Sequence, residues 1–317
     1  MSAAAAALFG AAVQARNALY NHGILASRQL QGPVVSVGNL SVGGSGKTPF
    51  IIALGELLLA RKIPFDVLSR GYGRDSRGAL IVDPAGSPRQ FGDEPLLIAR
   101  RLQVPVVLGE ERYAAGLLAE QNFGPRLHLL DDGFQHRQLA RNFDIVLLTA
   151  EDARDRLLPA GRLREPLSSL ARADVLVFTA GADAAQIPAA HGKPIWRARR
   201  GILPRNLPPH PVAFCGIARP KNFFAQLRTA GVETSAEAVF RDHHAYNEND
   251  VRELLRLRDQ SGGGGFVTTE KDAINLGPML EQLKPLSVVP VQMRLENAAE
   301  ALGAMLDTLA RRGKPVA

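Results

Sequence analysis

A glycine-rich stretch that ends in a lysine and a threonine is the strongest chemical signal in this chain. It lies between an apolar, strand-like run at 33–37 and a helix-like pattern at 50–59, and it contains Gly43, Gly44, Ser45, Gly46, Lys47 and Thr48. Glycines let successive main-chain N–H groups curve around an anion, and the start of the following helix adds partial positive charge. In such a loop we expect Lys47 to reach the β- and γ-phosphates of a nucleotide and Thr48 to bind Mg²⁺. Strand, glycine loop and helix in this order predict a P-loop rather than a simple turn, although Ser41 replaces the first glycine of the strict motif.

Two adjacent carboxylates follow another apolar run and are candidates for a metal site. Residues 127–130 read Leu-His-Leu-Leu, and Asp131 and Asp132 come directly after them. A buried strand that ends in an acidic residue can hold Mg²⁺ directly or through water beside a P-loop. A plain turn would also place two acids at a strand end. The polar residues that follow, Gln135 and His136, favour the ligand site because they extend the polar cluster.

A third carboxylate, Asp93, opens a helix-like segment after a glycine turn. Acidic residues in a first helical turn often stabilise the helix N-terminus, and that role alone fits the position. The alternative is a general base that orients an acceptor hydroxyl and takes up its proton late in the reaction. His243 and His244 follow a predicted strand, and one of them could pair with Asp93 when two domains close. Two exposed loop histidines would look the same in sequence.

Two basic loops add further candidates. Residues 69–74 follow a predicted strand and offer two arginines and a tyrosine to a nucleotide or phosphate, and residues 158–166 form a proline-containing basic loop with Glu165. Glu165 is a candidate supporting partner of the metal or of the base. The guanine-reading Asn-Lys-x-Asp motif is missing, since Lys271 and Asp272 are adjacent in the Thr-Thr-Glu-Lys-Asp run at 268–272. This argues against a GTPase.

Composition places the chain among folded, non-secreted proteins. Its 317 residues are enough for two domains or one enlarged α/β domain. The single cysteine, Cys215, excludes an internal disulfide and a thiolate metal cluster. The net charge of +7 comes mainly from arginine, which suits contacts to phosphate or carboxylate. Charge alone does not separate nucleic acid, anionic lipid and a phosphorylated substrate, and an ordinary solvated surface also fits.

The N-terminal segment resembles neither a cleavable signal nor a membrane span, because Gln14 and Arg16 interrupt its apolar run too early. Leu8, Leu19 and Tyr20 can share one face of a helix with small alanines. A helix of this kind can lie in a membrane interface or pack on its own domain.

Short apolar runs alternate with helical patterns over most of the chain. This alternation predicts a three-layer α/β/α domain of the P-loop type with a mostly parallel sheet, followed by a second, smaller α/β domain. We place the N-terminal helix at 1–30, the P-loop domain at 31–202 and the smaller domain at 203–317. The boundary is set at a basic, proline-rich stretch near 197–211, and residues 299–312 are predicted to form an amphipathic helix.

Taken together, the motifs resemble the tetraacyldisaccharide 4′-kinase family, the lipid A kinases of Gram-negative bacteria. The matching stretches occur in order along most of the chain, at 37–49, 69–74, 92–95, 131–136, 158–161, 163–166, 216–220, 242–244 and 268–272. The resemblance implies an ATP- and Mg²⁺-dependent transfer of the γ-phosphoryl group to the 4′-hydroxyl of an acylated glucosamine disaccharide 1-phosphate. It also implies a protein held at the cytoplasmic face of the inner membrane by its N-terminal helix, with no nucleic-acid partner.

The resemblance also suggests roles for individual residues. It implies that Asp93 is the general base and that a histidine of the 242–244 run, preferably His243, is its partner. It further implies that the metal and nucleotide are surrounded by Lys47, Thr48, Asp131, Asp132, Gln135, His136 and Glu165. Two other functions stay open at this point: a P-loop ATPase or switch that transfers phosphate only to water, and a kinase of a soluble sugar or nucleoside.

Overall fold

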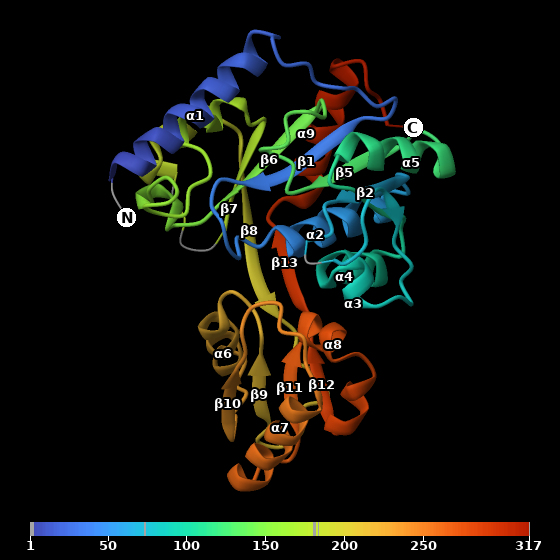
Figure 1. The fold of residues 1–317 in the computed structure, drawn as a ribbon, viewed down its shortest axis with the longest axis vertical. Coiled ribbons are helices and arrows are strands. Elements are labelled where there is room, and N and C mark those ends of the chain that lie inside the picture. Colours follow the sequence, from blue (N-terminus) through green and yellow to red (C-terminus); the bar gives the residue numbers. More distant parts are fainter. Residues whose placement is uncertain (1–2, 73, 180–181, 183, 317) are drawn as a thin grey trace.

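The computed structural model describes residues 3–72, 74–179, 182 and 184–316, so Gly73 of the 69–74 loop lies outside the described residues. Its larger part is built on a nine-stranded sheet in the order β13-β8-β7-β6-β1-β5-β2-β4-β3 (Figure 1). The strands are β1 Val34–Asn39, β2 Phe65–Ser69, β3 Leu80–Ile81, β4 Val106–Leu108, β5 Leu127–Asp131, β6 Phe143–Leu148, β7 Val175–Phe178, β8 Ile195–Ile202 and β13 Val291–Leu295. From β8 to β4 neighbouring strands are parallel, and only the two edge strands, β13 and β3, are antiparallel to their neighbours.

Helices cover both faces of this sheet. They are α1 Ala3–Asn21, α2 Lys47–Ala60, α3 Pro88–Phe91, α4 Asp93–Leu102, α5 Arg112–Phe123 and α9 Ala298–Arg311, with short 3₁₀ helices at Asp152–Arg154, Leu167–Arg172, Ala184–Gln186 and Pro188–Ala190. The central strands are apolar without interruption because both of their faces are buried. The predicted three-layer α/β/α fold with a mostly parallel sheet is therefore confirmed.

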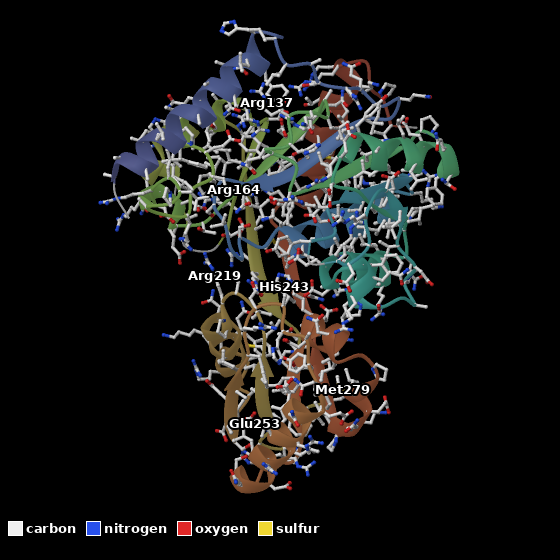
Figure 2. The ribbon with its side chains drawn as sticks, viewed as in Figure 1. Arg137, Arg164, Arg219, His243, Glu253 and Met279 are labelled. Carbon is white, nitrogen blue, oxygen red and sulfur yellow. The ribbon has the colours of Figure 1, made fainter. Side chains whose placement is uncertain are left out.

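The smaller part has its own four-stranded parallel sheet in the order β10-β9-β11-β12. Its elements are β9 Val212–Cys215, α6 Pro220–Thr229, β10 Ala236–Val239, α7 Glu248–Ser261, β11 Phe266–Thr269, α8 Glu270–Leu276, a 3₁₀ helix at Gly277–Leu283 and β12 Leu286–Val289. Strands β8 and β13 run side by side between the two parts. His243 and Arg219 of the smaller part face the larger one across the junction (Figure 2).

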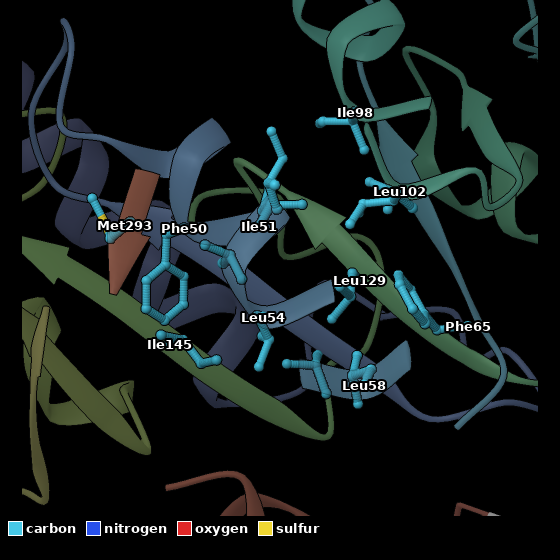
Figure 3. Close-up of a cluster of buried hydrophobic side chains, with 14 of the residues drawn as sticks. Phe50, Ile51, Leu54, Leu58, Phe65, Ile98, Leu102, Leu129, Ile145 and Met293 are labelled. Atoms are coloured by element: carbon cyan, nitrogen blue, oxygen red, sulfur yellow. The ribbon is translucent and has the colours of Figure 1, made fainter. Parts of the chain in front are cut away.

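The main core lies between α2, α4, α9 and one face of the large sheet (Figure 3). Phe50, Ile51 and Leu54 of α2 are almost completely buried against the sheet. Successive strand residues point to opposite faces, so Leu129 joins this core while Leu130 joins the cluster under α5. This packing holds the N-terminus of α2, and with it the glycine loop, at the carboxyl ends of the parallel strands.

The C-terminal part of the chain differs from the predicted division at 202/203. β13 pairs antiparallel with β8, and α9 packs Leu302 and Met305 into the core of the larger part, so residues 291–311 return there. The start of the stretch predicted to be the domain boundary, residues 197–202, belongs to β8. The amphipathic pattern of 299–312 correctly predicted a helix, but such a pattern does not reveal which core the helix will cover.

Candidate active site

One cavity of about 550 Å³ lies between the two parts of the molecule. That volume falls in the range of small-molecule sites. The glycine loop forms one wall, the carboxyl ends of β2 and β5 form another, and loops at the ends of β9, β10 and β11 close it from the smaller part. The carboxyl edge of a parallel sheet is where α/β proteins bind ligands.

The loop from Gly43 to Thr48 has the backbone needed to surround a phosphate. Gly43 and Gly46 take positive φ angles of 101° and 89°, which residues with a side chain rarely adopt. Gly46 is the N-cap of α2, so the first free N–H groups of the helix point at the cavity. The buried Ser45 hydroxyl has no hydrogen-bond partner in the part of the chain that the structure describes. The loop is therefore shaped for an anion.

Lys47 lies in a cluster of charges at the base of the cavity. Its Nζ donates to Asn39 Oδ1 at 3.0 Å and is 3.5 Å from Asp132 Oδ1. Arg164 donates to both Asp132 oxygens at 2.8 Å, the bidentate geometry of a strong arginine–carboxylate pair. Burial raises the pKa of Asp132, but the hydrogen bond from Arg164 and the charge of Lys47 outweigh it and hold that pKa well below its usual range.

Asp131 has the opposite electrostatic environment. Ser69 Oγ donates to Asp131 Oδ2 at 2.8 Å, while the buried Oδ1 has no partner among the described residues. Burial, together with the charges of Glu94 and Asp132, raises the pKa of Asp131 to about 6 despite nearby Lys47. An unpaired, desolvated carboxylate oxygen beside a phosphate loop is suited to bind a cation or its bound water.

The residues present fit Mg²⁺. Thr48, Asp131 and Asp132 all line the cavity. Within the described ranges no three His, Cys, Asp or Glu side chains are grouped to hold a metal by themselves. Mg²⁺ in nucleotide sites uses one or two carboxylates together with phosphates and water, so a full protein cage is not required.

Asp93 begins α4 and contacts the smaller part across the cavity. His243 Nδ1 lies 2.8 Å from Asp93 Oδ2, Asn275 Nδ2 donates to the same oxygen at 3.2 Å, and the Glu94 N–H donates to Oδ1 at 2.8 Å. Burial raises the pKa of Asp93, but the hydrogen bond from His243 and the charge of Lys271 lower it to about 2. The hydrogen bond to Asp93 in turn raises the pKa of His243. The pair is therefore a buried carboxylate beside a histidine whose protonated form it favours.

The doubled histidine, left open by the sequence, is resolved geometrically. His243 takes a left-handed backbone conformation (φ 55°) that directs its ring to Asp93, whereas His244 Nε2 contacts Asp250 at 2.9 Å in the smaller part. Asp272 fixes the loop that carries His243 through hydrogen bonds. That buried carboxylate accepts from Gly216 N at 2.7 Å and from Tyr246 Oη at 2.8 Å.

Sequence reasoning did not assign a role to Asp272, although it noted the Thr-Thr-Glu-Lys-Asp run. The same run also joins the two parts. Lys271 donates to Glu94, and Glu270 accepts from Arg101 at 2.8 Å. Acidic and basic residues at the start of α8 thus meet α4 next to Asp93. In the sequence these residues could have been found as a dense cluster of charges at the junction of a predicted strand and helix.

Three predicted residues lie outside the cavity. Glu165 is 2% exposed, and its carboxylate accepts from Asn17 Nδ2 of α1 at 2.8 Å and from Arg172, so it anchors α1 here instead of facing a metal. Gln135 donates to the Asn39 carbonyl, and its own carbonyl accepts from Arg16 of α1. His136 lies in the same region and does not line the cavity either. The metal and nucleotide roles expected for these residues have no geometric support in this structure.

The fold and the residues of the cavity define the class of enzyme to which this chain belongs. A parallel α/β sheet, a glycine loop at a helix N-terminus, paired aspartates and a separate carboxylate–histidine pair are the parts of a P-loop phosphotransferase. A family profile described as Tetraacyldisaccharide-1-P 4′-kinase (LpxK) matches residues 2–311. The chain belongs to this family, and the resemblance inferred from its motifs is confirmed.

Relatives match over almost the whole chain. A tetraacyldisaccharide 4′-kinase of Koribacter versatilis is 50% identical over 318 residues, which cover 96% of this chain and 98% of the relative. One from Geobacter metallireducens is 40% identical, covering 90% and 91%. A solved structure described as "apo" form LpxK from Aquifex aeolicus in complex with ATP is similar, with a TM-score of 0.77, 36% identity and 95% of each chain covered.

Proposed function

We propose that this protein is an ATP-dependent kinase that phosphorylates the 4′-hydroxyl of tetraacyldisaccharide 1-phosphate in lipid A biosynthesis. The observation that carries the proposal is the Asp93–His243 pair, which shares one cavity with the glycine loop and the paired aspartates. An enzyme that only hydrolyses ATP has no need of a site for an organic acceptor hydroxyl beside that pair. The family and its relatives supply the identity of the acceptor.

The residues divide the work of phosphoryl transfer among them. When bound, Mg·ATP supplies the phosphoryl group and the metal charge that neutralises its oxygens. The amides of the 43–48 loop and Lys47 hold the phosphates, and Thr48 with Asp131 and Asp132 would hold the metal. Asp93 orients the acceptor hydroxyl. A carboxylate with a pKa of about 2 is a weak base, so it accepts the proton late, when the hydroxyl oxygen is already bonding to phosphorus.

The acceptor's anionic head group has a suitable region beside α1. Burial, together with the charges of Arg112 and Arg141, lowers the pKa of His136 to about 4, which reports positive potential near this side chain. Arg112 is itself buried, and its Nε has no partner in the described part of the chain. His136, whose Nε2 has no partner among the described residues, therefore suits the 1-phosphate of the acceptor better than the nucleotide.

Helix α1 provides a surface for the membrane. Leu8 is 77% exposed and Leu19 is 39% exposed, while the polar Asn17 faces inward to Glu165. Neighbouring Ile24 and Leu25 are exposed as well. Among the described residues no helix is long and apolar enough to cross a bilayer. We propose that α1 lies in the interface of the inner membrane, on its cytoplasmic side, where ATP is available.

The deciding experiment offers purified protein [γ-³²P]ATP with detergent-dispersed tetraacyldisaccharide 1-phosphate. The proposal expects a labelled bis-phosphorylated lipid whose formation requires the lipid acceptor and Mg²⁺. Release of inorganic phosphate that does not depend on lipid, with no labelled lipid, would favour an ATPase. Equal activity on a disaccharide without acyl chains would instead favour a kinase of soluble sugars.

A further inference from the structure

Arg200 of the long strand β8 lines the nucleotide cavity but belongs neither to the glycine loop nor to the carboxylate groups. In the β8–β13 ladder it lies directly opposite Met293. Residues opposite each other in an antiparallel pair project from the same face. A Cβ placed on Gly46 would be only 2.9 Å from Met293 Cε, so this face of the ribbon abuts the glycine loop. Arg200 therefore stands beside the phosphate-binding wall of the cavity.

The guanidinium of Arg200 is half-buried and unpaired. No described residue forms a hydrogen bond or ion pair with this side chain, and its Nε is completely buried without a partner. Burial and the positive charge of Arg219 lower the pKa of Arg200, which shows that its surroundings disfavour the cation in the free protein. A desolvated cation without a counter-charge is costly unless a ligand supplies that charge.

Several other cations that line the cavity already have carboxylate partners. Lys47 contacts Asn39 and Asp132, and Arg219 pairs with Glu151 at 2.9 Å. Arg219 also approaches the loop, because a Cβ on Gly44 would lie 3.9 Å from its Cγ. Arg200 and Arg219 thus both line the cavity beside the loop, and only Arg219 has its guanidinium paired with a carboxylate. Guanidinium groups bind phosphate oxygens with paired, directional hydrogen bonds.

We infer that Arg200 binds the triphosphate of ATP from the β8–β13 ribbon and is a nucleotide ligand in addition to the glycine loop and Lys47. This inference rests on the proposed function, because it requires ATP in the cavity. The triphosphate supplies the negative charge that the free protein lacks at this position. Loss of the contact weakens ATP more than AMP, since AMP has a single phosphate to offer.

The test compares Arg200→Gln and Arg200→Lys with Arg199→Gln. Arg199 is the neighbour on the same strand, but its side chain is 81% exposed and pairs with Glu296 outside the cavity. Calorimetric titration of the full chain with Mg·ATP should show Arg200→Gln binding roughly 10- to 100-fold more weakly, the scale of a lost hydrogen bond to a charged group. Arg200→Lys should lose less, and Arg199→Gln should match the wild type. AMP should bind all four proteins alike.

A merely structural role predicts a different result. Because the unpaired charge destabilises the free protein, Arg200→Gln should melt at the same temperature as the wild type or higher without nucleotide. Should Arg200→Gln melt lower or fail to fold, or bind Mg·ATP like the wild type, Arg200 is not the ligand inferred here. A raised KM for the lipid acceptor with unchanged ATP binding would assign the side chain to the acceptor instead. If the wild type itself does not bind Mg·ATP, the proposed function fails together with this inference.

Discussion

Replacing Asp131 by asparagine should make the nucleotide-free protein more stable while disabling its metal site. The carboxylate is 6% exposed, one of its oxygens is unpaired, and its pKa is raised to about 6. Ionisation of this group is therefore easier in the unfolded chain than in the folded one. Asparagine keeps an acceptor for the Ser69 hydroxyl but carries no charge to desolvate.

The size of the effect follows from linkage. A folded-state pKa above the unfolded value means that the native state loses stability as pH rises from about 4 through 6. The rise from the ordinary value of 3.8 to about 6 corresponds to up to about 3 kcal/mol above pH 7 and about 0.5 kcal/mol at pH 4. For a chain of this size 3 kcal/mol is a rise of roughly 5 °C in Tm.

Thermal unfolding at pH 4 and pH 8 measures this difference directly. Asp131→Asn should melt higher than the wild type at pH 8, with little difference at pH 4, and should gain less stability from added Mg·ATP. Asp132→Asn is the matched control, because Arg164 and Lys47 lower the pKa of Asp132 and its loss should destabilise the protein at pH 8. If Asp131→Asn melts at or below the wild-type temperature at pH 8, the electrostatic argument for the metal site is refuted.

Four further variants probe the remaining parts of the site and the exposed face of α1. Lys47→Ala should abolish lipid phosphorylation, by at least about 10³-fold, because it removes a cation from the charged transition state; substantial turnover would contradict its assigned role. Asp93→Ala should lower kcat by roughly 10²–10⁴-fold with little change in ATP binding, and near-normal kcat would remove Asp93 from the mechanism. His243→Gln should raise the pKa of Asp93, since the hydrogen bond from His243 contributes to lowering it, and so move the acid limb of kcat at saturating Mg·ATP to higher pH; an unchanged limb would show that His243 does not control the ionisation of Asp93. Leu8→Asp with Leu19→Asp should reduce sedimentation with phospholipid vesicles while leaving ATP binding intact, and unchanged sedimentation would exclude α1 as the membrane contact.

Much of this site could be predicted from sequence because its signals are local. A glycine loop before Lys47, and two aspartates after an apolar run, each lie within a few residues of the strand that positions them. The parallel fold then brings both to one edge of the sheet. Asp93 was only a candidate from its glycine turn and helix start, and its role as a base came from the family resemblance.

The remaining features depend on contacts between distant segments. Glu165 looked like a metal ligand in a basic loop. Its hydrogen-bond partner, Asn17 of α1, lies 148 residues away in sequence, so this contact could not be predicted from local sequence. The choice between His243 and His244 depends on one left-handed backbone angle. For β8 a signal was present, since exposed and buried residues alternate from 195 to 199, but its arginines and the prolines that follow suggested a domain boundary.

The most direct test of the account is a crystal structure with a non-hydrolysable ATP analogue and Mg²⁺. The triphosphate should lie on the main-chain amides of the 43–48 loop, with the metal beside Thr48 and Asp131 and with Asp93 facing the terminal phosphate. A cavity that stays empty at saturating nucleotide, or a nucleotide bound elsewhere with its metal remote from the paired aspartates, would contradict it.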